Sequence, residues 1–477
     1  MRFTTVSLFA ILTFVTACDT PSHLTHIEGL GSIDFPNSGI EAAQLPFYRG
    51  VLLMHSFEFE DAATAFREAQ AADPEFALAY WGEAMTYNHP LWQSKDVEAA
   101  TKVLARMDSV GATGADFREN MYVDAVRLLY GAGSKTEQDE VYMLAMQTIS
   151  ANHPEDDEAR AFYALSVLGS TDGDRDFDVY ERGATIAKPV FERNPDHPGA
   201  AHYIIHSYDD PGHAHLGLAA AEAYSEIAPG AAHAQHMTTH IFLAQGNWRR
   251  VIENNIRAMN VSDARANQLG RPTGVCGHYS SWRHYAHLQI GEMEMASQMM
   301  DDCFERVKGD HRVSEWYYFG GMRGHHILST ESWDLVERWM PDLSSLPDNE
   351  MPGEIAFTNA LVYLKMGNIE EADKWHAYLK RDRSDLVQMM AKMIDGYRAV
   401  VTGDVEAGLA LLKEVSELEA SRPFEFGPPS LVKPTHELYA EALAESGNVE
   451  TALAQYAIAA SRTPGRQILA KSKSLTK

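Results

Sequence analysis

A repeated spacing of small, aromatic and proline residues most constrains how this chain can fold. In its clearest instance, small residues stand at three sites, an aromatic residue at a fourth and a proline at the last: Gly50, Ala62, Phe66, Ala69 and Pro74. Small residues let two helices approach, an aromatic ring fills the gap between them, and proline ends the second helix. Matching sites recur 34 residues later, at Ala84 and Tyr87. The spacing predicts helix pairs that bury their apolar faces against neighbouring pairs.

This pattern resembles the tetratricopeptide repeat (TPR). Further units are marked by Gly246, Trp248 and Ala258; by Gly291 and Ala296; by Gly324 and Trp333; by Ala360, Tyr363, Gly367 and Ala372; by Gly396 and Gly403; and by Ala440, Gly447, Ala452, Ala459 and Pro464. Residues 115–154 and 155–195 have helical periodicity but match the pattern poorly. The resemblance implies an all-α fold, a right-handed α-solenoid of about eleven TPR-like helix pairs. Its concave groove would be lined by the first helix of each pair.

The start of the chain has the pattern of a bacterial lipoprotein signal. Arg2 precedes a short apolar run from Val6 to Val15, and Val15-Thr16-Ala17-Cys18 resembles a lipobox, whose cysteine is lipidated and becomes the first residue. The alternative is an ordinary secretory peptide cleaved nearby. We expect a signal peptide over residues 1–17, a tether over 18–41, the repeat domain over 42–470 and a tail over 471–477. The mature protein would be lipid-anchored at the periplasmic face of the envelope, with the choice between inner and outer membrane left open.

Charge and cysteine content restrict the partners and the compartment. The formal net charge of −27 leaves no basic stripe to neutralise phosphates, which excludes nucleic acid as a partner. Besides Cys18, the chain has only Cys276 and Cys303. Outside the cytoplasm such a pair is free to form a disulfide. A pair of thiol ligands is the competing interpretation.

Eight of the 21 histidines lie between His197 and His240. His202 and His206 are four residues apart, and so are His236 and His240, one repeat of 34 residues later. Side chains four apart leave the same face of a helix. Two successive first helices therefore each present an imidazole-rich face at the same place in the repeat.

In the TPR register these faces point into the groove. The resemblance places nine histidines there: His55, His89, His202, His206, His233, His236, His240, His278 and His325. We expect His202, His206, His236 and His240 to meet at one metal ion, with Asp209 or Asp210 completing the site, although the Asp-Asp-Pro turn is equally a helix stop. The other five histidines, with Trp92 beside His89, would line a ligand groove. His284 and His287 fall on packing sites and are predicted to be structural.

A first-row transition metal such as zinc, copper or iron suits neutral imidazole with one carboxylate. Structural histidines, or recognition of a ligand without metal, are the alternatives for this face. The sequence has no zinc-protease motif, Ser-His-Asp spacing, phosphate loop, dinucleotide fingerprint or CxxC, so catalysis remains open. His202–His206, Asp209–Pro211 and His233–His240 resemble stretches of a histidine-rich group of bacterial envelope TPR lipoproteins, a resemblance that implies no activity. The sequence favours a membrane-anchored TPR lipoprotein with a metal site in its groove. The alternative is a metal-free scaffold that binds an envelope protein, a peptide or a small molecule.

Overall fold

The computed structural model describes residues 24–171, 175–308, 313–340, 342, 351–467 and 475. The predicted signal peptide, Cys18 and nearly all of the predicted tail lie outside these residues. Within them the chain is built from α-helices that pair in sequence order, together with two short antiparallel strand pairs.

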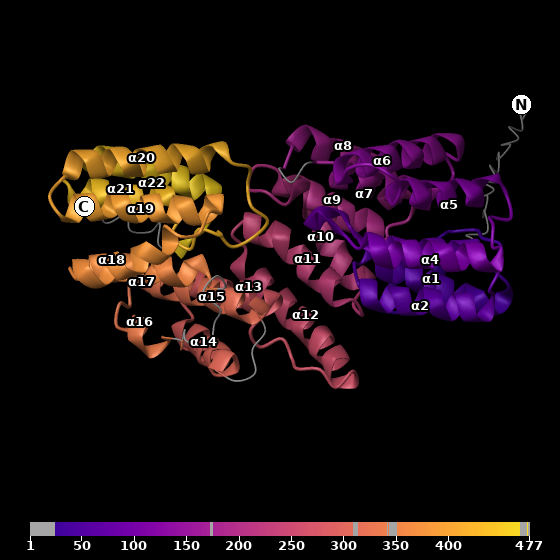
Figure 1. Ribbon diagram of the computed structural model, residues 1–477, viewed down its shortest axis with the longest axis horizontal. Coiled ribbons are helices and arrows are strands. Elements are labelled where there is room, and N and C mark those ends of the chain that lie inside the picture. The colour runs from indigo at the N-terminus through magenta and orange to yellow at the C-terminus, as the bar shows by residue number, and fades with distance from the viewer. Residues whose placement is uncertain are drawn as a thin grey trace, which may run out of the picture.

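The helices of the described residues form eleven consecutive pairs, from α1 and α2 to α21 and α22 (Figure 1). Their bounds are α1 Glu41–His55, α2 Phe59–Ala72, α3 Ala77–Met85, α4 Val97–Val110, α5 Phe117–Leu129, α6 Lys135–Asn152, α7 Asp157–Gly169, α8 Phe177–Arg193, α9 Pro198–Tyr208, α10 Ala214–Ile227, α11 Ala232–Ala244, α12 Trp248–Gln268, α13 His278–Gln289, α14 Met293–Lys308, α15 Val313–Thr330, α16 Leu335–Arg338, α17 Gly353–Lys365, α18 Ile369–Leu379, α19 Asp385–Val401, α20 Val405–Ser421, α21 Thr435–Glu445 and α22 Val449–Arg462. The predicted all-α solenoid of helix pairs is confirmed.

The repeat residues pack as their sizes require. The ring of Phe66 on α2 lies against Gly50 on α1 and Gly82 on α3, and a Cβ added at either glycine would come within 2.8 Å or 2.3 Å of that ring. Phe66 is fully buried. One aromatic residue therefore fixes the approach of three successive helices, which is why the pattern of small and aromatic residues predicts the stacking.

The segment before α1 differs from the tether expected over residues 18–41. Strands β1 (Thr25–Ile27) and β2 (Gly31–Ile33) form an antiparallel hairpin. Phe35, which follows it, has no exposed surface and packs against Trp81 and Tyr122, with ring centroids 5.8 and 5.2 Å away. The described part of this segment is thus part of the folded domain, because its apolar side chains cover the end of the first repeats.

The C-terminal segment folds back onto the middle of the array. Trp248 on α12 donates a hydrogen bond from its indole Nε1 to the carbonyl oxygen of Gly465, at 2.9 Å. The buried Arg466 donates to the hydroxyl of Tyr285 on α13 at 2.9 Å and forms an ion pair with Glu437 on α21. In Figure 1, α9, α11 and α13 accordingly lie in the middle of the molecule, between the indigo and the yellow ends. The faces expected to line an open groove are therefore largely covered.

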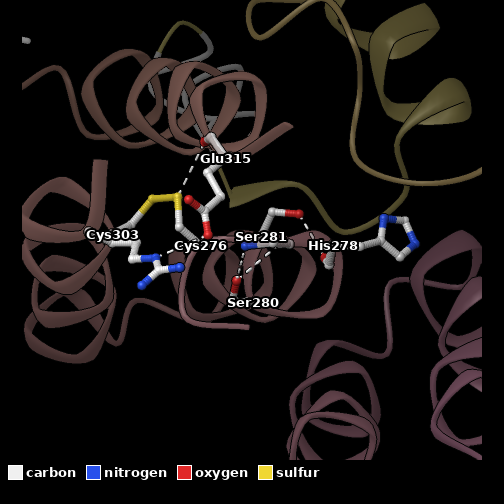
Figure 2. Close-up of a disulfide and its surroundings, with 8 residues drawn as sticks. Cys276, His278, Ser280, Ser281, Cys303 and Glu315 are labelled. Atoms are coloured by element: carbon white, nitrogen blue, oxygen red, sulfur yellow. Dashed lines mark hydrogen bonds and ion pairs between the residues drawn. A yellow bond between two sulfur atoms is a disulfide. The ribbon is translucent and has the colours of Figure 1, made fainter. Parts of the chain in front are cut away.

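Cys276 and Cys303 form a disulfide that joins the start of α13 to α14, with their Cα atoms 4.7 Å apart (Figure 2). Both sulfur atoms are thereby committed, so they do not form a pair of thiol ligands. Closing the loop between them stabilises the fold by about 3.5 kcal/mol in the chain-entropy treatment. Among the described residues, none of the helices combines the length and the apolar character that a membrane span needs.

If the hairpin segment belongs to the folded domain, Phe35→Ala should lower the free energy of unfolding by about 3–5 kcal/mol, as for other buried aromatic residues. Leu45→Ala on α1 is the control, because this leucine is 65% exposed and its loss should cost less than about 0.5 kcal/mol. Urea unfolding followed by circular dichroism measures both. Equal stability of the two variants would show that residues before α1 are a tether after all.

Candidate metal centre

Five imidazoles form a closed ring between α9 and α11. Their ring centroids lie 4.8 Å apart for His202–His206, 5.7 Å for His206–His240, 5.1 Å for His240–His236, 6.1 Å for His236–His233 and 5.1 Å for His233–His202. A sixth, His278 at the start of α13, lies 4.5 Å from His236. The helical spacing of four residues places two histidines on each helix, and the stacking of α9 against α11 brings the two faces together.

The ring nitrogens of His202, His206 and His233 lie within 4.8 Å of one another. The buried Nε2 atom of each has no hydrogen-bond partner among the described residues. Nδ1 of His202 lies 2.7 Å from the carbonyl oxygen of His55, which can only accept, so Nδ1 carries the proton and Nε2 keeps its lone pair. Buried nitrogen atoms without partners are costly, and here three neighbouring imidazoles each have one.

The second part of the cluster is formed by His236, His240 and His278. Nε2 of His236 lies 3.2 Å from Nε2 of His240 and 2.9 Å from Nε2 of His278. Behind the first two rings, Nδ1 of His236 faces the side-chain oxygen of Asn255 at 2.8 Å, and Nδ1 of His240 faces Asp209 at 3.0 Å. Nδ1 of His236 and Nδ1 of His240 are thus held from behind, while their Nε2 atoms face each other.

Asp209 lies behind the imidazoles, which differs from its expected place as a direct ligand. One of its carboxylate oxygens is 3.0 Å from Nδ1 of His240 and 3.4 Å from Nδ1 of His206, and the other forms an ion pair with Arg175. Burial raises the pKa of Asp209, but Arg175 and the two imidazoles outweigh this effect and hold the pKa below its usual range. A carboxylate in this position fixes the orientation of histidines, as in many metal sites. His206, Asp209 and His240 also lie close enough to form a ligand group of their own.

Burial keeps four of these imidazoles neutral. The pKa values of His202, His233 and His236 are held well below the ordinary value, first by burial and then by neighbouring imidazoles. Burial likewise lowers the pKa of His278, to about 4. Neutral imidazole is the form that binds metal ions.

Aromatic rings enclose the cluster. Phe57 lies 4.2 Å from the ring of His202 and 5.4 Å from that of His233. Trp282 on α13 lies 4.6 Å from the rings of both His236 and His240. These side chains exclude water from the imidazoles, which strengthens any electrostatic interaction inside.

Phe57 reaches the cluster from a backbone conformation that disfavours large side chains. Its φ is +55°, at the turn between α1 and α2. The same turn, with the same pair of backbone hydrogen bonds, holds Gly246, Gly367 and Gly447 in three later repeats, with φ of +69°, +76° and +83°. Glycine adopts this conformation freely, whereas a side chain there costs on the order of 1 kcal/mol. Strain of this kind concentrates at functional sites.

The four expected ligands, His202, His206, His236 and His240, do not form a separate group in the structure. His233, expected only in the ligand groove, completes the set with His202 and His206, and His278 lies beside His236. Asp210 points away from the cluster and contacts Arg175 and His213, at 3.2 and 2.9 Å. It accepts a hydrogen bond from the backbone of Gly212, which fits the helix-stop interpretation of the Asp-Asp-Pro turn.

Three other groove histidines lie outside the cluster. His89 stacks on Phe59 with 4.3 Å between ring centroids, and Trp92 is 54% exposed, 5.9 Å from the ring of His233. His325 packs edge-on against Tyr285. His55 belongs to a separate buried group, described next.

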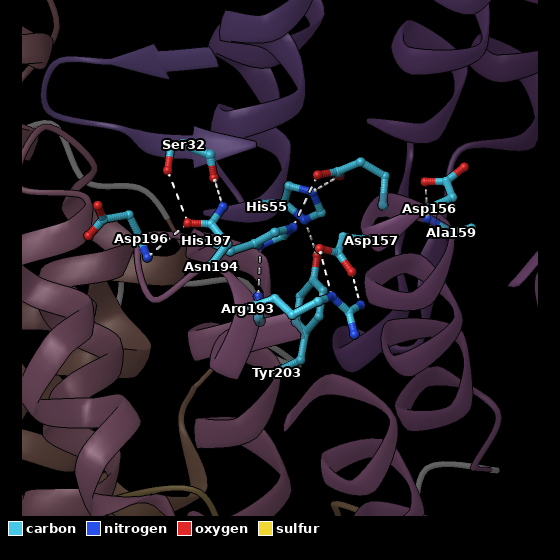
Figure 3. Close-up of polar contacts among 12 residues, drawn as sticks. Ser32, His55, Asp156, Asp157, Ala159, Arg193, Asn194, Asp196, His197 and Tyr203 are labelled. Carbon is cyan, nitrogen blue, oxygen red and sulfur yellow. Dashed lines mark hydrogen bonds and ion pairs between the residues drawn. The ribbon is translucent and has the colours of Figure 1, made fainter. Parts of the chain in front are cut away.

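His55, His197 and Glu158 form a fully buried group that needs no ion. Figure 3 shows His55 and His197 close together, with Tyr203 beside them. Glu158 lies 2.6 Å from Nε2 of His55 and 3.0 Å from Nε2 of His197. The remaining nitrogens face the hydroxyl of Tyr203 and the backbone N–H of Ala200, at 2.8 and 3.1 Å. Although their spacing would suit a metal ion, every imidazole nitrogen already has a protein partner, so this group joins α1, α7 and α9 structurally.

His284 and His287 lie on the packing face, as their register predicted. His284 is fully buried, with Nε2 3.1 Å from Nδ1 of His326, and Nδ1 of His287 lies 2.8 Å from Glu292. Neither His284 nor His287 belongs to a group of potential metal ligands with the clustered histidines.

Cavities open on two sides of the cluster. One, of about 940 Å³, is lined by residues that include Phe57, Glu58, His89, Arg265 and Tyr279. The other, of about 250 Å³, is lined by residues that include His278, Trp282, Tyr318, Glu354 and Glu425. His278 and Phe57 therefore lie between the buried imidazoles and space that a small molecule could enter.

Sequence reasoning missed four residues that shape the cluster: Phe57, Arg175, Asn255 and Trp282. Phe57 carried a signal, because it occupies a turn position that other repeats fill with glycine. Asn255 and Arg175 lie on or beside second helices, and their contacts depend on how the repeats stack.

No protein-family model matches this chain, and no curated protein matches it. Similar solved structures include yeast Tom70, with 8% identity and a TM-score of 0.33 over 92% of this chain and 96% of that chain. They also include the P58(IPK) TPR domain (13% identity, TM-score 0.24, 91% and 98%) and the human IFIT1 dimer with m7Gppp-AAAA (11% identity, TM-score 0.37, 90% and 90%). With TM-scores this low, the fold rests on the helix pairs themselves, and the function rests on the site.

Acid should destabilise the metal-free protein through the packed histidines of α15. Burial lowers the pKa of His326 to about 4 and that of His325 to about 3, whereas both rise toward about 6.5 on unfolding. Stability is therefore complete above pH 6.5 and falls as the pH drops toward 4, by about 1.4 kcal/mol per pH unit for each such group. Urea unfolding at pH 7.5, 5.5 and 4.5 with EDTA measures this slope.

His325→Gln should reduce the slope by about one such group. His215→Gln, at an exposed position on α10, is the control for the loss of any imidazole. Equal unfolding free energies at pH 7.5 and 4.5 would show that these histidines are protonated in the folded protein.

Proposed function

We propose that this α-solenoid binds a transition-metal ion, zinc, copper or iron, through His202, His206 and His233. One observation carries the proposal: one ring nitrogen from each of the three imidazoles lies within 4.8 Å of the others, and the buried Nε2 atom of each has no hydrogen-bond partner among the described residues. Buried polar atoms are mostly paired, as in the Glu158 group. Other buried nitrogens without a partner, such as Nδ1 of His284, belong to no group of potential ligands within 4.8 Å of one another among the described residues. A cation would supply a partner for one nitrogen of each imidazole at once, and neutral imidazole suits these metals.

The surroundings support a built site. Nδ1 of His202 is held by a backbone carbonyl and Nδ1 of His206 faces Asp209, the arrangement that orients histidine ligands. The strained backbone of Phe57 places an apolar ring against the same imidazoles. A set of purely structural histidines would need neither these orienting contacts nor the strained backbone of Phe57.

Metal analysis tests the proposal. The full-length protein, purified without a histidine tag and dialysed against Zn²⁺ or Cu²⁺, should retain bound metal after gel filtration, and His206→Ala should lose most of it. His284→Ala is the matched control, because it removes a buried imidazole from the packing face; it should cost stability and leave the metal content unchanged. Binding should also weaken below about pH 6, since protonated imidazole cannot ligate.

Two results would contradict the metal site. The first is a native protein that retains no metal; the second is a His206→Ala variant that folds and keeps the full content. Either would favour the metal-free scaffold that binds a peptide or another envelope protein.

We further propose that the protein is a lipoprotein of the cell envelope, anchored through Cys18. Support comes from the lipobox pattern and from the Cys276–Cys303 disulfide, because disulfides persist mainly outside the cytoplasm. Cys18→Ala should leave an unprocessed precursor or move the protein from the membrane to the soluble fraction. Cys303→Ala, which also removes one cysteine, should remain membrane-bound. If Cys18→Ala fractionates and migrates like the native protein, the anchor is elsewhere or absent.

A further inference from the structure

The smaller of the two cavities, of about 250 Å³, combines acidic and aromatic side chains. Two carboxyl groups and four aromatic rings contribute to its lining: Glu354, Glu425, Trp282, Tyr317, Tyr318 and Phe426. Within the described residues the lining contains no lysine and no arginine. A concave space with negative charge and no basic side chain favours a positively charged ligand over an anion.

Glu354 is the buried acidic group of this cavity. It lies in the first turn of α17 and is only 6% exposed. Apart from its own backbone N–H, its carboxyl group has neither a hydrogen-bond donor nor a basic side chain as a partner among the described residues. Burial raises the pKa of Glu354 to about 7, because no positive charge compensates for the lost water. A ligand is the group that can supply this charge.

The missing partner distinguishes Glu354 from the other buried glutamates of the described residues. Each of those has a charged or hydrogen-bonding partner: Glu83 has Arg106, Glu119 has Ser38, Glu158 has His55, Glu315 has Arg306, Glu437 has Arg466 and Glu441 has Lys433. Such pairing is expected, because a buried carboxylate without a partner is costly. The fold therefore provides partners for its structural glutamates and leaves the one in the cavity without one.

Aromatic rings lie around this carboxyl group. Trp282 is 4% exposed, and the rings of Tyr317 and Tyr318 on α15 have their centroids 5.8 Å apart. Burial and the nearby Glu354 raise the pKa of Tyr317 to about 12, so this ring is close to the carboxyl group. The face of an aromatic ring attracts cations, and aromatic cages bind organic ammonium ions in this way.

Two adjacent glycines of α15 shape the cavity. A Cβ added at Gly320 would lie 3.1 Å from Pro352 and 3.7 Å from Glu354, so this glycine allows α17 to approach. Gly321 lines the cavity, and a Cβ added there would meet no neighbouring group within 4 Å. Gly321 thus leaves open space where most residues would place a side chain.

We propose that this cavity binds a small organic ammonium ion, with its positive charge against Glu354 and its alkyl groups against the aromatic rings. The site is distinct from the proposed metal centre, because His202, His206 and His233 do not line it. A permanently protonated Glu354 with a purely structural role is the competing explanation.

Binding of two ammonium probes, choline and n-butylammonium, tests the proposal. Each is compared with a neutral compound of similar shape, 3,3-dimethyl-1-butanol for choline and 1-pentanol for n-butylammonium. Full-length protein is titrated at about pH 8.5, where Glu354 is ionised, with EDTA to keep metal ions out of the histidine cluster. At least one ammonium probe should bind about tenfold more tightly than its neutral counterpart, as measured by ligand-observed NMR.

Two variants locate the bound probe. Glu354→Gln keeps the shape of the side chain and removes its charge, so the ammonium probe should bind about tenfold more weakly and its neutral counterpart as before. Glu406→Gln is the matched control, because Glu406 lies in the first turn of α20 and is exposed; it should change neither. Gly321→Leu should fill the cavity and abolish binding of both compounds, while leucine suits the helix better than glycine.

Failure of both ammonium probes to bind, or binding no tighter than that of their neutral counterparts, would overturn the proposal. Ammonium binding that persists unchanged in Glu354→Gln or in Gly321→Leu would also overturn it, because the probe would then lie elsewhere. Circular dichroism confirms that each variant is folded before it is titrated. Since EDTA is present throughout, these results do not depend on whether the proposed metal centre exists.

Discussion

The closing of the helix array on itself is the constraint on which the rest of this structure depends. The return of the C-terminal segment to α12 and α13, and the packing of α1 against α9, cover the faces that an open solenoid would expose. The side chains that the repeat register places in the groove are therefore buried in the interior. Buried polar atoms must then find partners, because leaving one unpaired costs about 1–3 kcal/mol.

The buried histidines meet this requirement in three ways. His55 and His197 share the carboxylate of Glu158, and His284 pairs with His326 on the packing face. In the ring between α9 and α11, however, acceptors hold Nδ1 of His202, His236 and His240, and the Nε2 atoms of His202, His206 and His233 have no partner among the described residues. The direction in which the lone pairs point, more than the number of histidines, distinguishes a ligand set from structural imidazoles.

The local geometry at Phe57 agrees with this distinction. Several later repeats, including those of Gly246, Gly367 and Gly447, use glycine to turn from the first helix to the second, whereas the first repeat has a strained phenylalanine whose ring lies on His202 and His233. The backbone conformation of Phe57 lowers stability, but its side chain covers the histidine cluster. Such strain is typical of a functional site.

The sequence by itself determined the helix pairs and their approximate number, because small and aromatic residues at fixed spacing leave few other ways to bury apolar surface. It left the cysteine pair open between a disulfide and two thiol ligands, and the structure decided for the disulfide. The sequence also determined that His202 with His206, and His236 with His240, share helix faces, since that follows from the helical period alone. Only the tertiary structure decided that His233 and His278 join them, that Asp209 lies behind the rings and Asp210 away from them, and that His55 pairs with Glu158. The positions of these side chains depend on the rotation of each repeat relative to the next and on which surface the returning C-terminal segment covers. A local pattern of residues predicts neither the rotation nor the covered surface.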